Sequence, residues 1–348
     1  MTGLGGGEAL AWFDGRLATG LVEVRPDVSG LDEGGWWALV VDFEGAVVAA
    51  RFAHVRPAAL PPAQRPWAGL AGPWHTSLDR SAYESAVREV RRRIDGGEVY
   101  QVNVCRVLEQ HVAQDADLLA LAHATAEQNP APYAGVLRLP GAEVVCASPE
   151  LFLRRDGARV ITGPIKGTAP TAELMLAKDV AENIMIVDLA RNDLSRVCRP
   201  GSVAVPDLLT VEHHPGLVHL VSRVTGALLP GTDWATLLAA LLPPASVSGA
   251  PKSTALQAIA DLEPVPRGPY CGAIGWVDAD AGTAQLAVGI RTFWTARDAH
   301  GRRLLRFGTG AGITWGSDPA GEWGETELKA RRLVGVASAA APSAKVVP

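Results

Sequence analysis

A lysine and a glutamate near the middle of the chain are the residues best placed to do chemistry. Lys166 lies in the run Pro-Ile-Lys-Gly-Thr (164–168), and Glu150 lies in Ser-Pro-Glu-Leu-Phe (148–152). Lysine is rarely fully buried unless it is paired, and an amine held near a carboxylic acid is a nucleophile beside an acid. The simpler interpretation is a surface hairpin with two solvated charges, and the pair alone does not decide between the two.

A predicted β-hairpin brings these two residues together. Residues 151–155 and 158–162 have strand character, and Asp156-Gly157 between them is a two-residue turn signal. If Arg155 pairs with Ala158, Glu150 falls opposite Gly163, close to the loop that carries Lys166.

Carboxylates recur at helical spacing in two further segments. Asp179 and Glu182 share one helical face, and Glu322, Glu325 and Lys329 form one stripe on the last predicted helix. Two such helices facing each other could hold a hard cation through one or two carboxylates each, which is the pattern of magnesium. The alternative is a pair of solvated faces with ordinary ion pairs.

Other polar residues give weaker signals. Gln101 and Asn103 share one face of a predicted strand at 99–108, which lines either a polar cavity or solvent. Arg291, on a predicted strand, is a candidate carboxylate clamp or an ordinary strand-end arginine. The run Phe-Gly-Thr-Gly-Ala-Gly (307–312) could let backbone amides approach an anion, but it matches no nucleotide-binding fingerprint. The histidines at 213, 214 and 219 lack zinc spacing.

The composition excludes several classes of protein. The 348 residues are 48% hydrophobic and 20% charged, with a formal net charge of −5. This mild acidity provides no electrostatic footprint for nucleic acid. No apolar run reaches membrane-spanning length, and residues 1–20 show no signal peptide. The scattered cysteines favour a reducing, cytoplasmic compartment: Cys105, Cys146, Cys198 and Cys271.

The elements come in blocks, which favours an α+β fold. Residues 1–75 are predicted to be a short β-rich segment, with a hairpin of 36–43 and 46–52, followed by a proline-rich connector. Residues 76–336 form the main domain, and 337–348 form a tail that we expect to be disordered. Within the main domain we predict helices at 81–94, 171–194 and from about 318, and a meander of strands at 271–278, 283–293 and 302–313.

Taken together, these segments resemble the chorismate-utilising enzymes, which include the anthranilate synthase large subunit, aminodeoxychorismate synthase component I, isochorismate synthase and salicylate synthase. The resemblance runs from about residue 77 to 334. Its ordered motifs begin at residues 97 (GEVYQVNVCR), 148 (SPELF), 163 (GPIKGT), 178 (KDVAENIMIVDLARNDL), 213 (HHPGLVHLVSRVTG), 246 (SVSGAPK), 269 (PYCGAIG), 289 (GIRT) and 309 (TGAGITWGSDP). The fold it implies is a large sandwich of two antiparallel sheets enclosed by helices.

The resemblance also implies a role for each site residue. Glu182 and Glu325 match magnesium ligands, supported by Asp179 and Glu322, and the metal holds the ring carboxylate of chorismate. Glu150 matches the general acid that protonates the departing C4 hydroxyl. The remaining matches bind or line the substrate pocket: Arg291 and Tyr270 at the enolpyruvyl carboxylate, Gly310 through its backbone, and His219, Ser246, Gly167 and Lys329 around them.

Two positions separate the branches of this family. Isochorismate and salicylate synthases carry a lysine base where this chain has Gln101, and glutamine cannot activate water. Anthranilate synthases typically carry alanine where this chain has Lys166, whereas the sequence PIKGT is typical of aminodeoxychorismate synthases. In that branch the lysine is thought to attack C2 and expel the C4 hydroxyl, and ammonia then attacks C4, giving 4-amino-4-deoxychorismate.

The resemblance implies a separate glutamine amidotransferase subunit, because the chain has no glutaminase-like cysteine. The product would serve p-aminobenzoate, and hence folate, or a secondary metabolite. The short N-terminal region lacks the tryptophan-feedback motif of anthranilate synthases, which puts tryptophan binding in doubt. Two alternatives remain: an anthranilate synthase large subunit with an unusual loop, or a non-catalytic scaffold for an amidotransferase.

Overall fold

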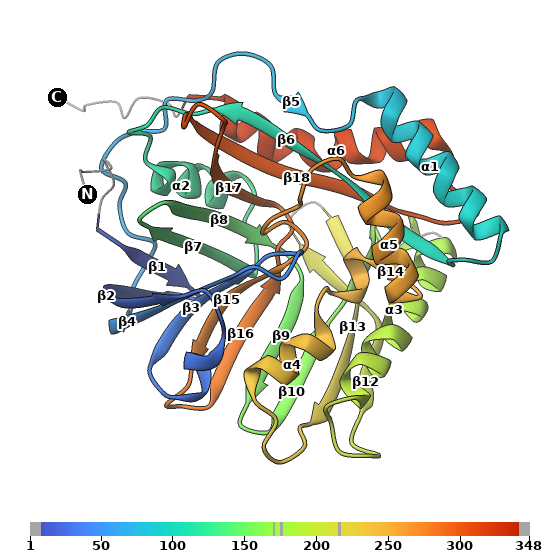
Figure 1. Ribbon diagram of the computed structural model, residues 1–348, viewed down its shortest axis with the longest axis horizontal. Coiled ribbons are helices and arrows are strands. Elements are labelled where there is room, and N and C mark those ends of the chain that lie inside the picture. Colours follow the sequence, from blue (N-terminus) through green and yellow to red (C-terminus); the bar gives the residue numbers. More distant parts are fainter. Residues whose placement is uncertain (1–7, 170, 175–176, 215–216, 341–348) are drawn as a thin grey trace.

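The computed structural model describes residues 8–169, 171–174, 177–214 and 217–340. Side chains are described over the same ranges except 168–169, 174, 177–179, 213–214 and 217. Figure 1 shows strands gathered through the centre of the molecule, with helices along its outer sides.

The strands form one antiparallel network that folds into two sheets. In the first sheet each strand pairs with the next in the order β6 (Gln101–His111), β18 (Arg303–Ile313), β17 (Thr292–Arg297), β8 (Ala142–Ser148), β7 (Tyr133–Leu139) and β1 (Leu10–Phe13). The short strands β5 (His75–Thr76) and β14 (Gly249–Ala250) also pair with β6.

The second sheet continues from the first through the pairing of β1 with β2. Its order is β2 (Arg16–Arg25), β4 (Val47–Pro57), β3 (Trp36–Val41), β15 (Ala273–Asp278), β16 (Thr283–Val288), β9 (Leu151–Asp156), β10 (Arg159–Gly163) and β13 (Leu217–Ala227). Both β11 (Ile165–Ala169) and β12 (Ala204–His214) pair with β13. The predicted α+β fold with two large antiparallel sheets is confirmed.

Helices cover these sheets. On the first sheet, α6 (Pro319–Ser338) packs on β18 and contacts α1 (Arg80–Asp95), α2 (Leu118–Gln128) packs on β8, and α5 (Lys252–Leu262) packs on β6. On the second, α3 (Ala177–Ser195) packs on β13 and β11 and contacts α4 (Trp234–Leu241). Three short 3₁₀ turns complete the described elements: η1 (Ser29–Asp32), η2 (Ala172–Leu174) and η3 (Ala245–Val247).

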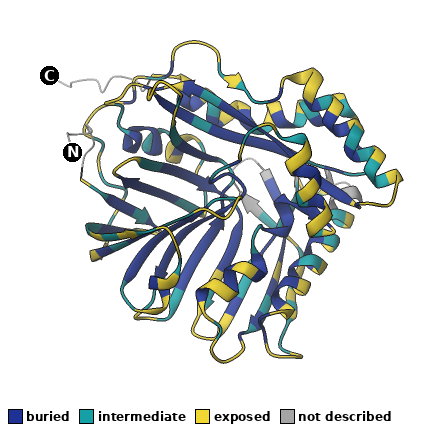
Figure 2. Ribbon diagram, viewed as in Figure 1, coloured by how far each residue is buried: buried dark blue, intermediate teal, exposed yellow. Residues whose placement is uncertain are grey.

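The core lies along the strands and the inner faces of the helices. Figure 2 shows the central strands almost continuously buried, whereas exposed residues follow the outer helix faces and the loop tips. The largest cluster of buried apolar side chains spans both the N-terminal hairpin and the last third of the chain, with Trp36, Phe52 and Trp276 in contact. Burial on this scale is the dominant stabilising term in folding.

The N-terminal segment is part of the sheets. The predicted hairpin of 36–43 with 46–52 is confirmed, with Val41 opposite Val47. The other edge of β3 pairs with β15, and β1 pairs with β7. Residues 58–74 contain no helix or strand, as the prolines predict, but Trp67 is buried and donates a hydrogen bond to Ala337 O.

Three predicted boundaries are wrong. The strand predicted at 283–293 is two strands, because Arg291 adopts a left-handed backbone (φ 54°) between them. These two strands pair with β9 and β8 respectively, so residues 271–313 do not form one meander. Residues 337 and 338, which were predicted to belong to the tail, are the last residues of α6; residues 341–348 lie outside the described part of the chain.

Two further local predictions need correction. The long helix begins at Ala177, later than the predicted start at 171, and residues 172–174 form a separate 3₁₀ turn. Thr171 follows a proline and is a residue type that often caps a helix, but it does not cap this one. In the hairpin, Asp156 pairs with Arg159, and a β-bulge then sets Gly163 opposite Leu151. Glu150 is therefore one position beyond the predicted register and still lies directly before β9.

The helices predicted at 81–94 and from about 318 are confirmed as α1 and α6, and each begins at an aspartate cap. Asp79 accepts a hydrogen bond from Ala82 N, and Asp318 accepts one from Gly321 N. Such caps satisfy backbone amides that the helix itself leaves unpaired. Pro319 follows at the first helical position, where its missing N–H costs nothing.

Candidate active site

Lys166 lies on β11 at a β-bulge against β13, with Gly167 in a left-handed conformation (φ 79°) immediately after it. A glycine adopts that conformation without the steric cost of a Cβ. The Lys166 side chain is 15% exposed, and its Nζ lies 3.8 Å from Oε2 of Glu182 on α3. Lys166 is therefore a mostly buried amine facing a carboxylate, and the interpretation as a solvated surface lysine is wrong.

Glu150 lies between β8 and β9 and is 4% exposed. Burial raises the pKa of its carboxyl to about 7, and the Ser246 hydroxyl, the Lys166 ammonium and the Ile165 N–H partly offset that rise. Burial raises a carboxyl pKa because it disfavours the charged form. Glu150 and Lys166 are thus close enough to interact, as the hairpin predicts, and near neutral pH the Glu150 carboxyl is only partly ionised.

Alternate glycines of β18 open one face of this strand to neighbouring side chains. A Cβ on Gly308 would lie 2.0 Å from the Tyr270 ring, and one on Gly310 would lie 2.5 Å from Cys105 Sγ. A Cβ on Gly312 would lie 2.4 Å from Gln101 Nε2 and 3.4 Å from Lys166 Nζ. The glycine-rich run is therefore a strand paired with β6, not an anion-binding loop.

Gln101 lines the site from β6. It is 1% exposed, and its Oε1 has no hydrogen-bond partner among the described residues. Gln101 and Asn103 are both buried, so this strand face does not face solvent. The Nε2 of Gln101 lies against Gly312, close to Lys166. A buried polar atom without a partner is costly unless a ligand or water satisfies it.

The stripe on α6 reaches the same strand. Lys329 donates a hydrogen bond to Gly310 O at 3.0 Å and forms an ion pair with Glu325 at 2.7 Å. Glu322, one turn earlier, is 8% exposed. Lys166 lies near Gly312 of β18 and pairs with Glu182 of α3, and Lys329 bonds to Gly310 of β18 and pairs with Glu325 of α6. A carboxylate from each of the two helices therefore approaches the same strand.

Arg291 and Tyr270 come together at the other end of the β18 glycine run. The Tyr270 ring lies against Gly308, and its hydroxyl is 3.9 Å from Cys105 Sγ. Burial lowers the pKa of Arg291, and the nearby Tyr270 partly offsets this while Arg332 adds to it. No carboxylate pairs with the Arg291 guanidinium within the described residues, which leaves its planar fork able to bind a carboxylate.

The remaining predicted residues lie as follows. His219 on β13 is 8% exposed and opposite both Thr168 and Glu212. Ser246 in η3 is buried and contacts the Glu150 carboxyl. The side chains of Asp179, His213 and His214 lie outside the described residues.

Residues that sequence patterns missed hold these elements in place. Asn183, fully buried beside Glu182, donates to Leu220 O and accepts from Ser222 Oγ at 2.6 Å, which fixes α3 on β13. Arg267, 1% exposed, pairs with Glu263 and donates to Asn103 O. The sequence offered one sign of the role of Asn183, which is an amide next to the apolar stretch of a buried helix. It offered no comparable sign that Arg267 is buried.

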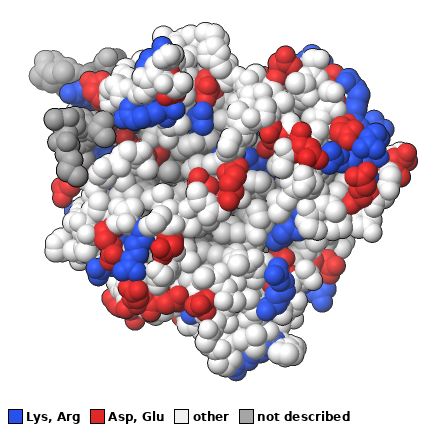
Figure 3. All heavy atoms as spheres, in the orientation of Figure 1, with Lys and Arg blue, Asp and Glu red and all other residues white. Residues whose placement is uncertain are grey.

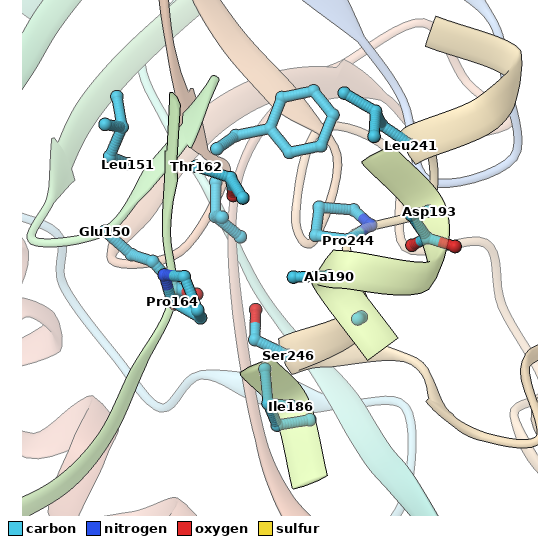
Figure 4. Close-up of a pocket in the computed structure, with 13 residues that line it drawn as sticks. Glu150, Leu151, Thr162, Pro164, Ile186, Ala190, Asp193, Leu241, Pro244 and Ser246 are labelled. Atoms are coloured by element: carbon cyan, nitrogen blue, oxygen red, sulfur yellow. The ribbon is translucent and has the colours of Figure 1, made fainter. Parts of the chain in front are cut away.

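A small pocket opens beside Glu150 (Figure 4). It is bounded by the end of the β9–β10 hairpin, by α3 and by the segment from Leu241 to Ser246. Lys166, Gln101 and Arg291 do not line it, so it adjoins the site described above and does not contain it.

The described side chains supply carboxylate oxygens for magnesium from two residues, and not from a larger cluster. Among the described side chains, no group of three or more His, Cys, Asp or Glu residues gathers at a metal-binding distance. Magnesium, however, is usually bound through one or two carboxylates and keeps its other positions for water and substrate oxygens. Glu182 and Glu325, one from each helix, supply hard oxygen donors of that kind.

Comparison with known proteins identifies the family. The family model described as "chorismate binding enzyme" matches residues 46–335. The chain belongs to this family. Chorismate binding enzymes of two kinds are similar in sequence: anthranilate synthase component 1 of Saccharolobus solfataricus is 39% identical, over 74% of this chain and 62% of that protein. Aminodeoxychorismate synthase component 1 of Salmonella typhimurium is 34% identical, over 86% of this chain and 68% of that protein.

The chain spans about 60% of the length of the curated anthranilate synthase relatives. Solved structures share the fold of this chain. A putative 2,3-dihydroxybenzoate-specific isochorismate synthase from Bacillus anthracis has a TM-score of 0.79 at 24% identity, covering 94% of this chain and 96% of its own. Anthranilate synthase component I from Streptococcus pneumoniae has a TM-score of 0.76 at 24% identity, covering 94% and 90% respectively.

No helix among the described residues is long and apolar enough to cross a membrane. All four cysteines are buried free thiols. Acidic and basic side chains are interspersed over the face shown in Figure 3.

Proposed function

We propose that this chorismate binding enzyme aminates chorismate at C4 with ammonia, giving 4-amino-4-deoxychorismate. The observation that carries the proposal is the position of Lys166, whose buried amine lies between Glu182 and the Gln101–Gly312 contact and interacts with the Glu150 carboxyl. A nucleophile and an acid in one site are what a displacement at an allylic alcohol requires.

The chemistry follows from these two groups. Lys166 first gives up its ammonium proton to solvent. Its neutral amine then attacks C2 as the C4–O bond breaks, and Glu150 donates the proton with which the hydroxyl leaves as water. Ammonia then attacks C4, and the C2–N bond to Lys166 breaks, returning the electron pair to the lysine. Glu150, now a carboxylate, takes the surplus proton from the new ammonium group. Once Lys166 regains its proton from solvent, the site is as it began.

In this proposal, the residues around Lys166 and Glu150 bind the substrate. Arg291, with Tyr270 beside it, binds the enolpyruvyl carboxylate through its guanidinium. Gln101 presents a buried amide to the ring and, unlike a lysine, cannot activate water for attack. The other proposed contacts come from residues around the pocket: the Gly310 backbone, Gly167, His219, Ser246 and Lys329.

Magnesium is part of the proposal. Glu182 and Glu325 would hold the ion, with Glu322 and Asp179 in support. Bound there, it supplies positive charge for the ring carboxylate of chorismate. Without it, Lys166 and Lys329 neutralise the two glutamates, so we expect the ion to release both lysines from these pairs.

The ammonia would come from a separate glutamine amidotransferase subunit. The names of the relatives, which call each of them component 1, support a second component. We further propose p-aminobenzoate synthesis, for folate or a secondary metabolite, as the destination of the product. The free thiols agree with a reducing cytoplasm.

Product identification tests the proposal. The purified chain is incubated with chorismate, magnesium and an ammonium salt at mildly alkaline pH, with and without an added aminodeoxychorismate lyase. A product that the lyase converts to p-aminobenzoate is expected. Anthranilate would instead support the second candidate, an anthranilate synthase large subunit, which the 39% identity to such enzymes favours. No product, even with an amidotransferase subunit added, would favour a scaffold.

A further inference from the structure

The pocket beside Glu150 is too small for chorismate. The centre of a water-sized molecule can move through about 30 Å³ of it, and about 10–15 Å³ suffices to hold one water. The pocket therefore accepts one or two molecules of that size. A ring with two carboxylates must bind elsewhere, on the side of Glu150 that faces Lys166.

The lining of the pocket changes along its length. Glu150 and Ser246 provide polar groups at one part of it, and Asp193 provides a carboxylate at another. Figure 4 shows Glu150 and Asp193 on opposite sides, with Ala190 and Pro244 on the Asp193 side. Most of the other lining is apolar: Leu151, Phe152, Ile186, Leu241, Ala245 and Val288.

The Asp193 side of the pocket is held by an ion pair. Lys252 Nζ lies 2.7 Å from Asp193 Oδ2 and also donates to Leu241 O. Asp193 is 6% exposed, and burial raises the pKa of its carboxyl although Lys252 partly offsets this. The pair ties α3 to the start of α5, so the apolar walls between α3 and the 241–246 segment are fixed in position.

We propose that this pocket receives ammonia and delivers it to C4 of the substrate. The inference rests on the proposed function. The pocket ends at Glu150, the group that would protonate the leaving C4 hydroxyl, so its inner end adjoins the carbon that ammonia attacks. An apolar wall favours neutral ammonia over ammonium, because burying an unpaired charge is costly. Glu150, left as a carboxylate when water departs, accepts the proton that the bound ammonia loses as its N–C4 bond forms.

Filling the pocket is the direct test. Ala190→Leu adds three carbon atoms to a side chain that lines it, whereas Ala235→Leu makes the same change at an exposed position of α4. For Ala190→Leu we expect the KM for ammonia to rise by about tenfold or more, the range that one or two methylenes produce in a closed pocket. The KM for chorismate should stay within about twofold, and Ala235→Leu should match the wild type.

Enlarging the pocket gives an independent readout if Ala190→Leu does not fold. Leu241→Ala removes a buried side chain from the wall. We expect this variant to use methylamine, and its ratio of methylamine to ammonia turnover should rise by about tenfold over the wild type. An unchanged ratio would contradict the proposal.

The outcomes separate the inference from the function on which it rests. If the wild type gives no 4-amino product, the proposed function fails, whatever the variants do. If the wild type aminates chorismate and Ala190→Leu keeps its KM for ammonia, the pocket is not an ammonia site. A lower kcat with an unchanged KM for ammonia would make it an exit for water, and a raised KM for chorismate would make it part of the substrate site.

Discussion

The Glu150 carboxyl sets how the site responds to pH. Its pKa of about 7 results mainly from burial, so the acid form that can protonate a leaving group predominates below that value. Around neutral pH both the acid and the carboxylate are populated, and the proposed cycle uses each in turn.

The pH profile of kcat/KM for chorismate should show this, because that ratio reports the pKa values of the substrate-free enzyme. We expect it to fall for the wild type as the pH rises above about 7, because Glu150 loses the proton that it must donate. Glu150→Gln should lower kcat by roughly 10²–10⁴-fold and remove this limb of the profile. A Glu150→Gln variant that retains the alkaline limb would assign the limb to another group.

The same carboxyl should affect stability. Its pKa is raised from 4.5 to about 7 in the folded state, so the stability conferred by the neutral form is lost progressively between those values. Above pH 7 the folded state carries a penalty of roughly 3 kcal/mol, at 1.36 kcal/mol per pKa unit. Urea denaturation should find Glu150→Gln more stable than the wild type at pH 8, and the difference should shrink toward pH 4.

Lys166 is the residue on which the reaction type depends. Lys166→Ala removes the nucleophile, and we expect formation of 4-amino-4-deoxychorismate from ammonia to fall by about 100-fold or more. An anthranilate-type product can then accumulate, which chromatography with mass spectrometry would detect. Lys166→Met, which keeps an unbranched side chain without the amine, is the matched control for packing. Unchanged amination in either variant would rule out a covalent role.

At the scale of elements, β18 combines packing with access to the site. Its glycines at 308, 310 and 312 accept the side chains of Tyr270, Cys105 and Gln101. A methyl group would meet different neighbours at two of these glycines. At Gly310 it would meet the backbone, with Val104 O at 2.6 Å, and at Gly312 it would meet the movable end of the Gln101 side chain.

We therefore expect one alanine substitution to lower stability and another to lower activity. Gly310→Ala should destabilise the fold by about 1–3 kcal/mol, because the backbone of β6 cannot move aside cheaply. Gly312→Ala should fold normally and lower kcat/KM by roughly tenfold to 100-fold, because Gln101 and Lys166 are displaced. Gly316→Ala, where a Cβ meets nothing within 4 Å, is the control. Thermal melting and steady-state kinetics on all three would test the distinction.

Sequence patterns predicted most of the helices and strands, but far fewer of the pairings between strands. Helical patterning located α1 and α6, and alternation located the polar face of β6 that carries Gln101. The break at Arg291 was missed because its left-handed backbone has no local signature in a non-glycine residue. The start of α3 was placed too early because Thr171 after a proline mimics a cap.

At the scale of the whole molecule, site residues come from both sheets and from helices packed on each. Motifs suffice to name them, because each lies in a recognisable run. The meeting of Lys166 with Gln101 depends on two strands that are far apart in the sequence, and the pocket beside Glu150 depends on side chains from five segments. Neither could be predicted from local patterns.

Arg267 is the residue that joins these parts. It is paired with Glu263 and donates to Val247 O and Asn103 O, while its own N–H donates to Glu44 at the tip of the N-terminal hairpin. Arg267→Met should destabilise the fold by about 3–5 kcal/mol, because it leaves a buried carboxylate uncompensated. Adding Glu263→Gln should recover part of that loss. The exposed pair of Arg88 with Glu84 is the control, and Arg88→Met should cost under about 0.5 kcal/mol.

The pairing of β3 with β15 has a consequence for biosynthesis. β3 is made long before β15 and consists of apolar residues, all buried in the finished protein, yet Val41 pairs with Ala273. At about 5–20 residues per second, a ribosome takes tens of seconds to produce the strand that covers this edge. During that interval the nascent hairpin presents an unpaired apolar edge, which is a template for aggregation. Folding yield in a cell should therefore depend on chaperones that hold the nascent hairpin until β15 has been made.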